Sequence, residues 1–297
     1  MKKSYSAAVA VVGAALLGTV FFARAASIPA AAEQRGEGQA TAPPAPAKPV
    51  PRTPWDGKPD LTGVWGGPLP AARTPTSEER GAALAELART YQPWALERSN
   101  GLAYVEDPRL HCGPYGFPRY IGLVSLVAPR RAFYFLLQIV QAPKETDVLI
   151  EYTYSSYRAI PTDGSTHPKT IVPSYFGDSV GRWEGDTLVV DVKGFNGKVW
   201  LDSGKLGTRP PGDLGGGTIT SDALHVVERW GLADGDTLEY QATVEDPRVL
   251  TRAWTTPKYL IKRAAPDAVI HEALCLDPED LGVIQAAAAA KEKEGKK

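Results

Sequence analysis

The stretch Ser179–Asp191, with the sequence SVGRWEGDTLVVD, predicts two antiparallel β-strands joined by a tight turn. β-Branched and apolar residues dominate the second half, as is typical of strands. Gly185 supplies the positive φ that a tight turn requires, and Asp186 caps that turn. The same GDTL tetrapeptide recurs at Gly235–Leu238. The two predicted hairpins together indicate a meander of antiparallel strands.

Alternation of apolar and polar residues predicts further strands on both sides of these hairpins. It is clearest in Thr237–Val244, where every second residue is apolar, as in a strand with one wet face. Phe133–Val140 is mostly apolar on both faces, so we expect it to be buried on both sides. The remaining strands are expected at Val148–Tyr154, Ser179–Trp183, Thr187–Val192, Ala223–Trp230, Tyr259–Arg263 and Val269–Cys275. Short strands at this spacing predict an all-β fold, namely an antiparallel β-barrel of about eight to ten strands or, alternatively, a β-sandwich.

One helix is expected before the strands. Thr76 and Glu79 have the spacing of a capping box at a helix N-terminus. Apolar residues follow at helical spacing as far as Tyr91. Pro93 then ends or bends the helix, because proline cannot continue the hydrogen-bond ladder.

The first 25 residues have the features of a secretory signal peptide. Lys2 and Lys3 precede an apolar run, Ala7–Phe22, and Ala23–Ala25 has the small-x-small pattern of a cleavage site. The run is shorter than the roughly 20 residues that span a bilayer. We therefore expect a periplasmic or secreted protein without a membrane span in its mature chain.

Composition predicts three further regions after the signal peptide. Residues 26–54 form a leader rich in Pro and Ala, which is expected to be disordered because it buries little apolar surface. Residues 55–285 form one β-rich domain, and residues 286–297 form a solvated tail.

The charge balance bears on the kind of partner. Without Lys2, Lys3 and Arg24, the 33 basic residues fall to 30 against 34 acidic ones, a net charge of −4. Nucleic acid binding requires clustered basic charge, so we expect no nucleic acid partner. The hydrophobic share of 43% is sufficient for a sizeable core.

The chain has two cysteines, Cys112 and Cys275. An even pair in an exported protein predicts one disulfide, which would join the early part of the domain to its last strand. A reactive thiol or a metal ligand is the alternative. His111 lies beside Cys112, but the spacing of the nearby acids is irregular, so no metal site and no cofactor are expected.

Asp60–Trp65, with the sequence DLTGVW, resembles the G-x-W opening strand of lipocalin-like barrels. In those barrels the tryptophan closes one end of the core. The resemblance implies that the predicted barrel is lipocalin-like and that Trp65 is a buried plug. A barrel of this size has an interior able to hold one small ligand.

A longer set of motifs resembles a widespread family of exported bacterial proteins without an assigned activity. The resemblance covers most of Trp55–Leu281 and includes both cysteines. Its motifs are His167–Lys169, Ser179–Asp191, Gly194–Asn196, Trp200–Asp202, Leu224–Arg229 and Asp246–Pro247. The chain departs from the family after Asp202, where an insert rich in Gly and Pro, Ser203–Thr220, replaces a short Pro-His-Ser link. The insert is a candidate for a mobile lid over a pocket.

The predicted strand Ala223–Trp230 contains the first candidates for acid/base catalysis. If its even-numbered face points inward, Glu228 is an acid on an apolar wall, and burial would raise its pKa. The alternative is a structural ion pair between Glu228 and an arginine inside the barrel. If the odd-numbered face points inward, His225 and Arg229 would suit an anionic or carbonyl group.

A loop supplies a second candidate for acid/base chemistry. Asp163 can orient His167 as a general base. Both residues are equally compatible with a simple turn, since Asp163-Gly164 is a turn signal.

Other polar and aromatic residues are candidates for ligand binding. Asn196 and Asp202 can bind hydroxyl groups while Trp200 stacks on a sugar or aromatic ring. Turn capping and core packing are the alternatives. Arg229 and Tyr240 are further candidates on the predicted strands.

Three hypotheses of function follow. The first is an exported protein that binds a small apolar or aromatic ligand in a barrel cavity. The second is a cofactor-independent hydrolase, lyase or isomerase that uses Glu228, His225 or His167 in the same cavity. The third is a structural envelope protein with a filled barrel. Fold analogy does not choose among them.

Overall fold

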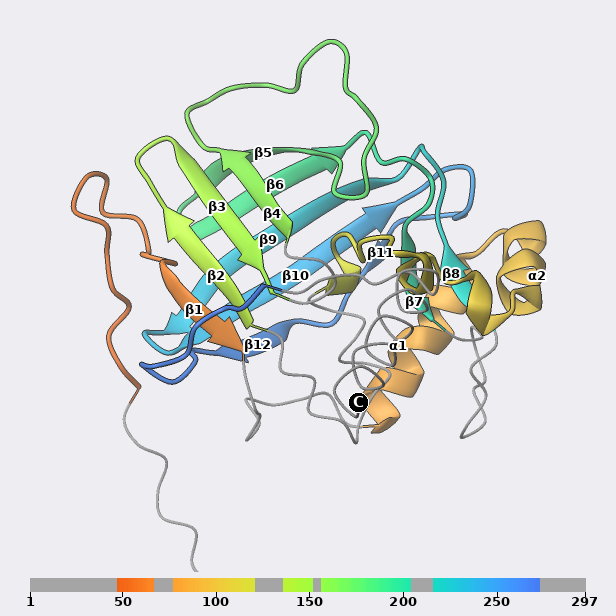
Figure 1. Cartoon of the computed structure of the whole chain (residues 1–297), viewed down its shortest axis with the longest axis horizontal. Coiled ribbons are helices and arrows are strands. Elements are labelled where there is room, and N and C mark those ends of the chain that lie inside the picture. The colour runs from red at the N-terminus through yellow and green to blue at the C-terminus, as the bar shows by residue number, and fades with distance from the viewer. Residues whose placement is uncertain (1–46, 67–76, 121–135, 152–155, 204–215, 273–297) are drawn as a thin grey trace, which may run out of the picture. The chain divides into compact units, whose positions relative to one another are not determined.

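Two antiparallel sheets account for most of the regular secondary structure among the described residues (Figure 1). The structure is a computed structural model that describes residues 47–66, 77–120, 136–151, 156–203 and 216–272. Strands outnumber helices, so the predicted mainly antiparallel β class is confirmed. The fold is built around a core that the inner faces of both sheets share.

The first sheet has four strands in the order β1-β2-β3-β4. Val140 of β2 is 40% exposed, whereas Leu137 and Ile139 are buried. The expectation that this strand is buried on both faces is therefore wrong for its described part, because the sheet covers the core with one face only. The strands are β1 Gly63–Gly66, β2 Leu136–Gln141, β3 Glu145–Ile150 and β4 Ser156–Pro161.

The second sheet has the order β11-β10-β9-β6-β5, and β12 pairs with β10 beside β11. Its register places Leu188, Trp230 and Tyr240 next to one another on three neighbouring strands, and all three are buried. The strands are β5 Asp178–Glu184, β6 Thr187–Lys193, β9 His225–Asp234, β10 Thr237–Glu245, β11 Trp254–Thr255 and β12 Tyr259–Lys262.

Most of the predicted strands in this part of the chain are confirmed, with one exception. The strand expected at Val269–Cys275 is wrong over residues 269–272, which form no strand, and residues 273–275 lie outside the described residues. The chain leaves the sheet after β12 because Ala268 donates its N–H to the carbonyl of Ala265 in a turn (2.9 Å).

The two GDTL turns require glycine for different physical reasons. Gly185 has a φ of +59°, as predicted for the β5–β6 turn. Gly235, in the β9–β10 turn, does not adopt a positive φ. There a Cβ would lie 2.7 Å from the carbonyl oxygen of Pro49, so close approach of the N-terminal segment requires the glycine.

Basic residues of the N-terminal segment bind both hairpin aspartates. Arg52 donates two hydrogen bonds to Asp186 (2.6 and 2.7 Å), and Lys48 lies 2.6 Å from Asp236. Described residues before Trp55 thus contact the turns of both hairpins.

Two helices precede β2 where one was expected. Helix α1 spans Ser77–Thr90, and α2 spans Pro93–Gly101. Pro93 ends the first helix as predicted, but it also begins the second, where its missing N–H costs nothing. Two short 3₁₀-helices follow, η1 Tyr104–Glu106 and η2 Pro108–His111. The predicted cap Thr76 lies outside the described residues.

Trp65 of β1 is fully buried, as the G-x-W resemblance implies. Its Nε1 donates to the carbonyl of Leu61 (2.9 Å), and the guanidinium of Arg263 lies 4.1 Å from the centre of its ring. Gly63 has a φ of +147°, and a Cβ there would lie 2.1 Å from Arg263 Nη1. Gly63 thus leaves room for the arginine that covers the tryptophan.

The predicted barrel is not closed. β4 and β5 lie against each other without a hydrogen-bonded ladder among the described residues. At the other seam, β1 meets the chain after β12 through the single bridge Trp65–Arg263. The architecture is two sheets around one core. A small third sheet, β7 Trp200–Ser203 with β8 Gly217–Ile219, lies in contact with α2.

Candidate functional site

The even-numbered face of β9 points inward, and Glu228 is fully buried on it. Arg158 of β4 donates to both carboxylate oxygens of Glu228, at 3.0 and 2.6 Å. Tyr240 donates to the same carboxylate at 3.0 Å, and Trp230 Nε1 does so at 3.3 Å. Burial and the charge of Glu228 raise the pKa of Tyr240 well above its usual value, so Tyr240 stays a donor.

This buried cluster is built as a structural ion pair, the alternative proposed for Glu228. Arg158 is also hydrogen-bonded to Ser179 (2.9 Å) and lies over the ring of Phe117. Four donor contacts occupy both oxygens of Glu228, so little acceptor capacity is left for a substrate proton. Because Arg158 and Glu228 come from different sheets, the pair ties the two sheets together.

A chain of imidazoles and carboxylates crosses the outer face of β5, β6, β9 and β10. His167, from the loop between β4 and β5, is hydrogen-bonded through Nδ1 to Asp178, and its Nε2 lies 3.1 Å from Asp191 Oδ1. His225 Nε2 lies 3.1 Å from the same oxygen, and its Nδ1 lies 3.2 Å from Glu245. The structure thus brings two predicted site residues, His167 and His225, to one carboxylate.

This arrangement leaves neither histidine a free nitrogen. A general base needs a ring nitrogen within hydrogen-bond reach of the proton that it removes. Both nitrogens of His167 and both nitrogens of His225 face carboxylates. These histidines and carboxylates are suited to fixing the β4–β5 loop on the sheet rather than to taking a proton from a substrate.

Asp191 is the carboxylate that His167 and His225 share, and it was not among the predicted site residues. Burial acts to raise the pKa of Asp191, but the hydrogen bonds and charges of His167 and His225 outweigh burial, so this pKa lies below its usual value. The available signal was an acid that breaks the apolar run of Thr187–Val192. Nothing in the sequence marks Asp178 and Glu245, which contact the other ring nitrogens of His167 and His225.

Two predicted pairings are corrected by this geometry. Asp163 does not orient His167; it accepts hydrogen bonds from the backbone and hydroxyl of Ser165, which is the turn alternative. Arg229 does not act with His225 inside the fold, because their shared face points outward. Arg229 pairs instead with Glu184 at 3.0 Å.

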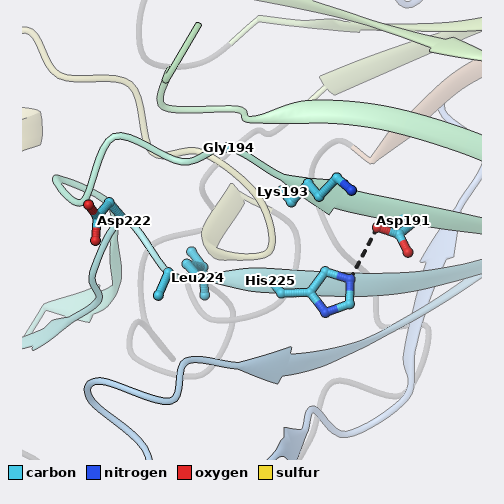
Figure 2. A pocket seen from close by; sticks show the side chains of 7 residues that line it. Asp191, Lys193, Gly194, Asp222, Leu224 and His225 are labelled. Carbon is cyan, nitrogen blue, oxygen red and sulfur yellow. Dashed lines mark hydrogen bonds and ion pairs between the residues drawn. The ribbon is translucent and has the colours of Figure 1, made fainter. Parts of the chain in front are cut away.

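An open pocket of about 470 Å³ lies beside this row of histidines and carboxylates, at the end of β6 and the start of β9. Figure 2 shows Asp191 and His225 facing each other across two strands, with Lys193 on the same strand as Asp191. Asp222, also on the lining, is bound by Arg248. Among the described residues, its lining contains no Phe, Tyr or Trp side chain to hold a ring.

The other predicted ligand-binding residues do not meet in one place. Asn196 Oδ1 accepts the backbone N–H of Lys198 (3.0 Å), which is the predicted alternative of turn capping. Tyr240 is buried in the Glu228 cluster. Asp202 is 6% exposed on β7.

Trp200 lies in a different pocket, of about 310 Å³, which we call the Trp200 pocket. It is formed by α2 and the following turns, the loop before β5, and strands β7 and β8. Trp200 and Tyr175 supply its aromatic surface, and Leu102 and Ile219 add aliphatic surface. Arg98, Glu106 and Lys198 supply its charged groups.

The indole of Trp200 is held against the backbone of β8. A Cβ at Gly217 would lie 2.3 Å from the six-membered part of the ring, so only glycine admits this packing. Trp200 is 7% exposed. The pocket thus has a rigid aromatic wall of the kind that small-molecule sites use.

Local sequence patterns indicated Trp200 but not the residues that share its pocket. Arg98 lies on a helix and Tyr175 in a loop, far from Trp200 along the chain. For Lys198, the only local signal was its position between two predicted residues, two after Asn196 and two before Trp200.

Two further expectations concern cysteine and metal. Cys112 is not a free thiol. Cys275 lies outside the described residues, so the pairing of the two stays a prediction.

In the described ranges, no three His, Cys, Asp or Glu side chains are arranged to hold a metal ion. Neither α-helix described has the length and hydropathy needed to cross a bilayer.

Comparison with known proteins gives little. No protein-family model matches the chain. No curated protein matches it either. A search of solved structures found a crystal structure of a mutant of the fluorescent protein UnaG, at 13% identity and a TM-score of 0.28. The match covers 69% of this chain and 96% of that one. A likeness at this TM-score supports no argument about function.

Proposed function

We propose that this chain is an exported protein that binds a small aromatic ligand in the Trp200 pocket. The observation that carries the proposal is the packing of Trp200 against Gly217 in a pocket shared with Tyr175. A fixed aromatic wall binds a ring at little entropic cost. The ligand is placed outside the two sheets, because Glu228 and Arg158 occupy the core between them.

The compartment belongs to the same proposal. The signal-peptide pattern in the sequence of Met1–Ala25 supports export to the periplasm or the medium. We further propose a lipocalin-like relationship, which the burial of Trp65 under Arg263 supports. Membership of the exported bacterial family rests on the motifs alone.

Acid/base catalysis is the less favoured candidate. Glu228 accepts four hydrogen bonds, and the nitrogens of His167 and His225 are all directed at carboxylates. A catalytic role would require these contacts to break before any proton moves.

Calorimetry with a matched pair of probes tests the proposal. The probes are 2-naphthoate and its neutral analogue 2-naphthamide, and the expected result is binding of at least one. Tyr175→Ala should weaken that binding about 5-fold, as loss of one aromatic contact implies. Tyr157→Ala is the control, because Tyr157 is 73% exposed on β4 and does not line the pocket.

Two outcomes oppose the proposal. If neither probe binds at about 1 mM, where the binding free energy is only about −4 kcal/mol, the aromatic-ligand function is wrong and a structural envelope role gains support. If Tyr175→Ala and Tyr157→Ala bind equally well, the ligand does not occupy the Trp200 pocket.

A further inference from the structure

The charged groups of the Trp200 pocket are not balanced. Two cations, Arg98 and Lys198, line it together with one carboxylate, Glu106. Arg98 Nη2 lies 3.4 Å from Glu106 Oε1, a long contact between exposed groups. No carboxylate in the described part of the chain pairs with Lys198. Counted over the described residues, the lining therefore carries one uncompensated positive charge.

Glu106 has little capacity left for a cationic ligand. Its Oε2 accepts the backbone N–H of Ala103 at 2.7 Å, and its Oε1 faces Arg98. A ligand cation would have to displace Arg98 and would meet the repulsion of Lys198. An anion finds the opposite situation, because an ammonium and a guanidinium are both strong donors to carboxylates and sulfonates.

The cation and the aromatic wall come from one short segment. Asn196 Oδ1 accepts the N–H of Lys198 and so fixes the turn that contains Gly197, which has a φ of +71°. Buried Val199 anchors the next position, and Trp200 begins β7. The spacing between charge and ring is thus set by a rigid turn and not by a flexible loop.

We propose that the ligand of this pocket is an aromatic acid, whose ring contacts Trp200 and Tyr175 and whose anionic group is bound by Lys198. Arg98 is the second donor to the same group. The proposal rests on the proposed function and narrows its ligand to one chemical class. A pocket of about 310 Å³ lies at the lower end of the range for small-molecule sites, which fits a ligand of one or two rings.

The same two probes distinguish an acid from a neutral ring. The purified protein is titrated with 2-naphthoate and with 2-naphthamide, which have nearly the same shape. We expect 2-naphthoate to bind about 10-fold more tightly at low ionic strength. Salt should reduce this preference, because it screens exposed charges.

Two lysine variants locate the charge that causes the preference. Lys198→Ala should abolish the preference for 2-naphthoate, because the affinity for 2-naphthoate falls about 10-fold with the loss of the ammonium group. Lys193→Ala is the control, because Lys193 is also exposed but lines the pocket beside His225. Both variants should unfold at the wild-type temperature, since neither side chain forms an ion pair among the described residues.

The outcomes separate this inference from the proposed function. Equal binding of the two probes, or a preference that survives Lys198→Ala, overturns the aromatic-acid inference but leaves the aromatic-ligand function standing. A preference lost in Lys193→Ala instead places the anion in the other pocket and also overturns it. Binding of neither probe defeats the proposed function itself.

Discussion

Glu228 illustrates how one buried charge depends on several partners. Removing one member of a buried ion pair leaves the other without compensation, which typically costs about 3–5 kcal/mol. Glu228→Gln keeps the shape but removes the charge that faces Arg158, so we expect the free energy of unfolding to fall by about 3 kcal/mol. Urea denaturation followed by tryptophan fluorescence measures this loss.

A double variant distinguishes charge from shape in this cluster. Arg158→Met combined with Glu228→Leu removes both charges and should be more stable than Glu228→Gln alone, because no buried charge is left unpaired. A double variant that is less stable than Glu228→Gln would contradict the assignment of a structural ion pair.

The lowered pKa of Asp191 predicts that the free energy of unfolding falls at acidic pH. Its pKa is lowered in the folded chain, so it contributes stability above the pKa of the unfolded state. That contribution is lost as the pH falls through the folded pKa, which places the window below about pH 4. Asp191→Asn should therefore flatten the loss of unfolding free energy below about pH 4. Denaturation of both proteins between about pH 3 and pH 6 checks this, and parallel curves would exclude the effect.

The loop 162–177, between β4 and β5, is attached to the outer face of the second sheet at two points. His167 contacts Asp178 and Asp191, and Ser174 pairs with the chain after β6 through Gly194 and Asn196. The same loop carries Tyr175 to the Trp200 pocket. Its position is therefore set by the side-chain contacts of His167 and by the backbone contacts of Ser174.

His167 and His225 form a matched pair for testing this loop. Both contact Asp191, but only His167 belongs to the loop. His167→Ala should speed amide hydrogen exchange over residues 162–177 about 10-fold or more, because the loop loses its side-chain anchor on the sheet. His225→Ala should leave exchange in the loop unchanged. Mass spectrometry of peptic fragments resolves the segment, and equal effects of both variants would contradict the loop anchor.

At the scale of the whole molecule, the sequence predicts one covalent link between distant segments. The predicted bond between Cys112 and Cys275 would close a loop of most of the domain. We expect the intact mass to be two hydrogens lighter before reduction than after it. Cys112→Ser and Cys275→Ser should each lower the free energy of unfolding by up to about 4–5 kcal/mol in the loop-entropy model. Two alkylatable thiols in the unreduced, unfolded protein would rule the bond out.

Local features of the sequence were sufficient for much of the fold. Gly185 and the alternation in β10 act within a few residues, so strands and hairpins could be predicted from them. Trp65 and its neighbouring glycine also marked a buried plug. The second helix at Pro93 was missed, because a proline that ends one helix can equally begin the next.

The pairings that define the candidate sites could not be predicted in the same way. Sequence placed Glu228, His225, His167 and Trp200 among the candidates, since each is a polar or aromatic residue in a notable local pattern. Their partners come from distant strands, loops and helices, and strand register decides which side chains meet. A shift of one residue in β9 would exchange Glu228 with the outward His225 face. Composition and periodicity thus determined the class of fold, whereas long-range register and packing decided which face of β9 is buried, that Glu228 is saturated by Arg158 and that Trp200 meets Tyr175 and Lys198 in an open pocket.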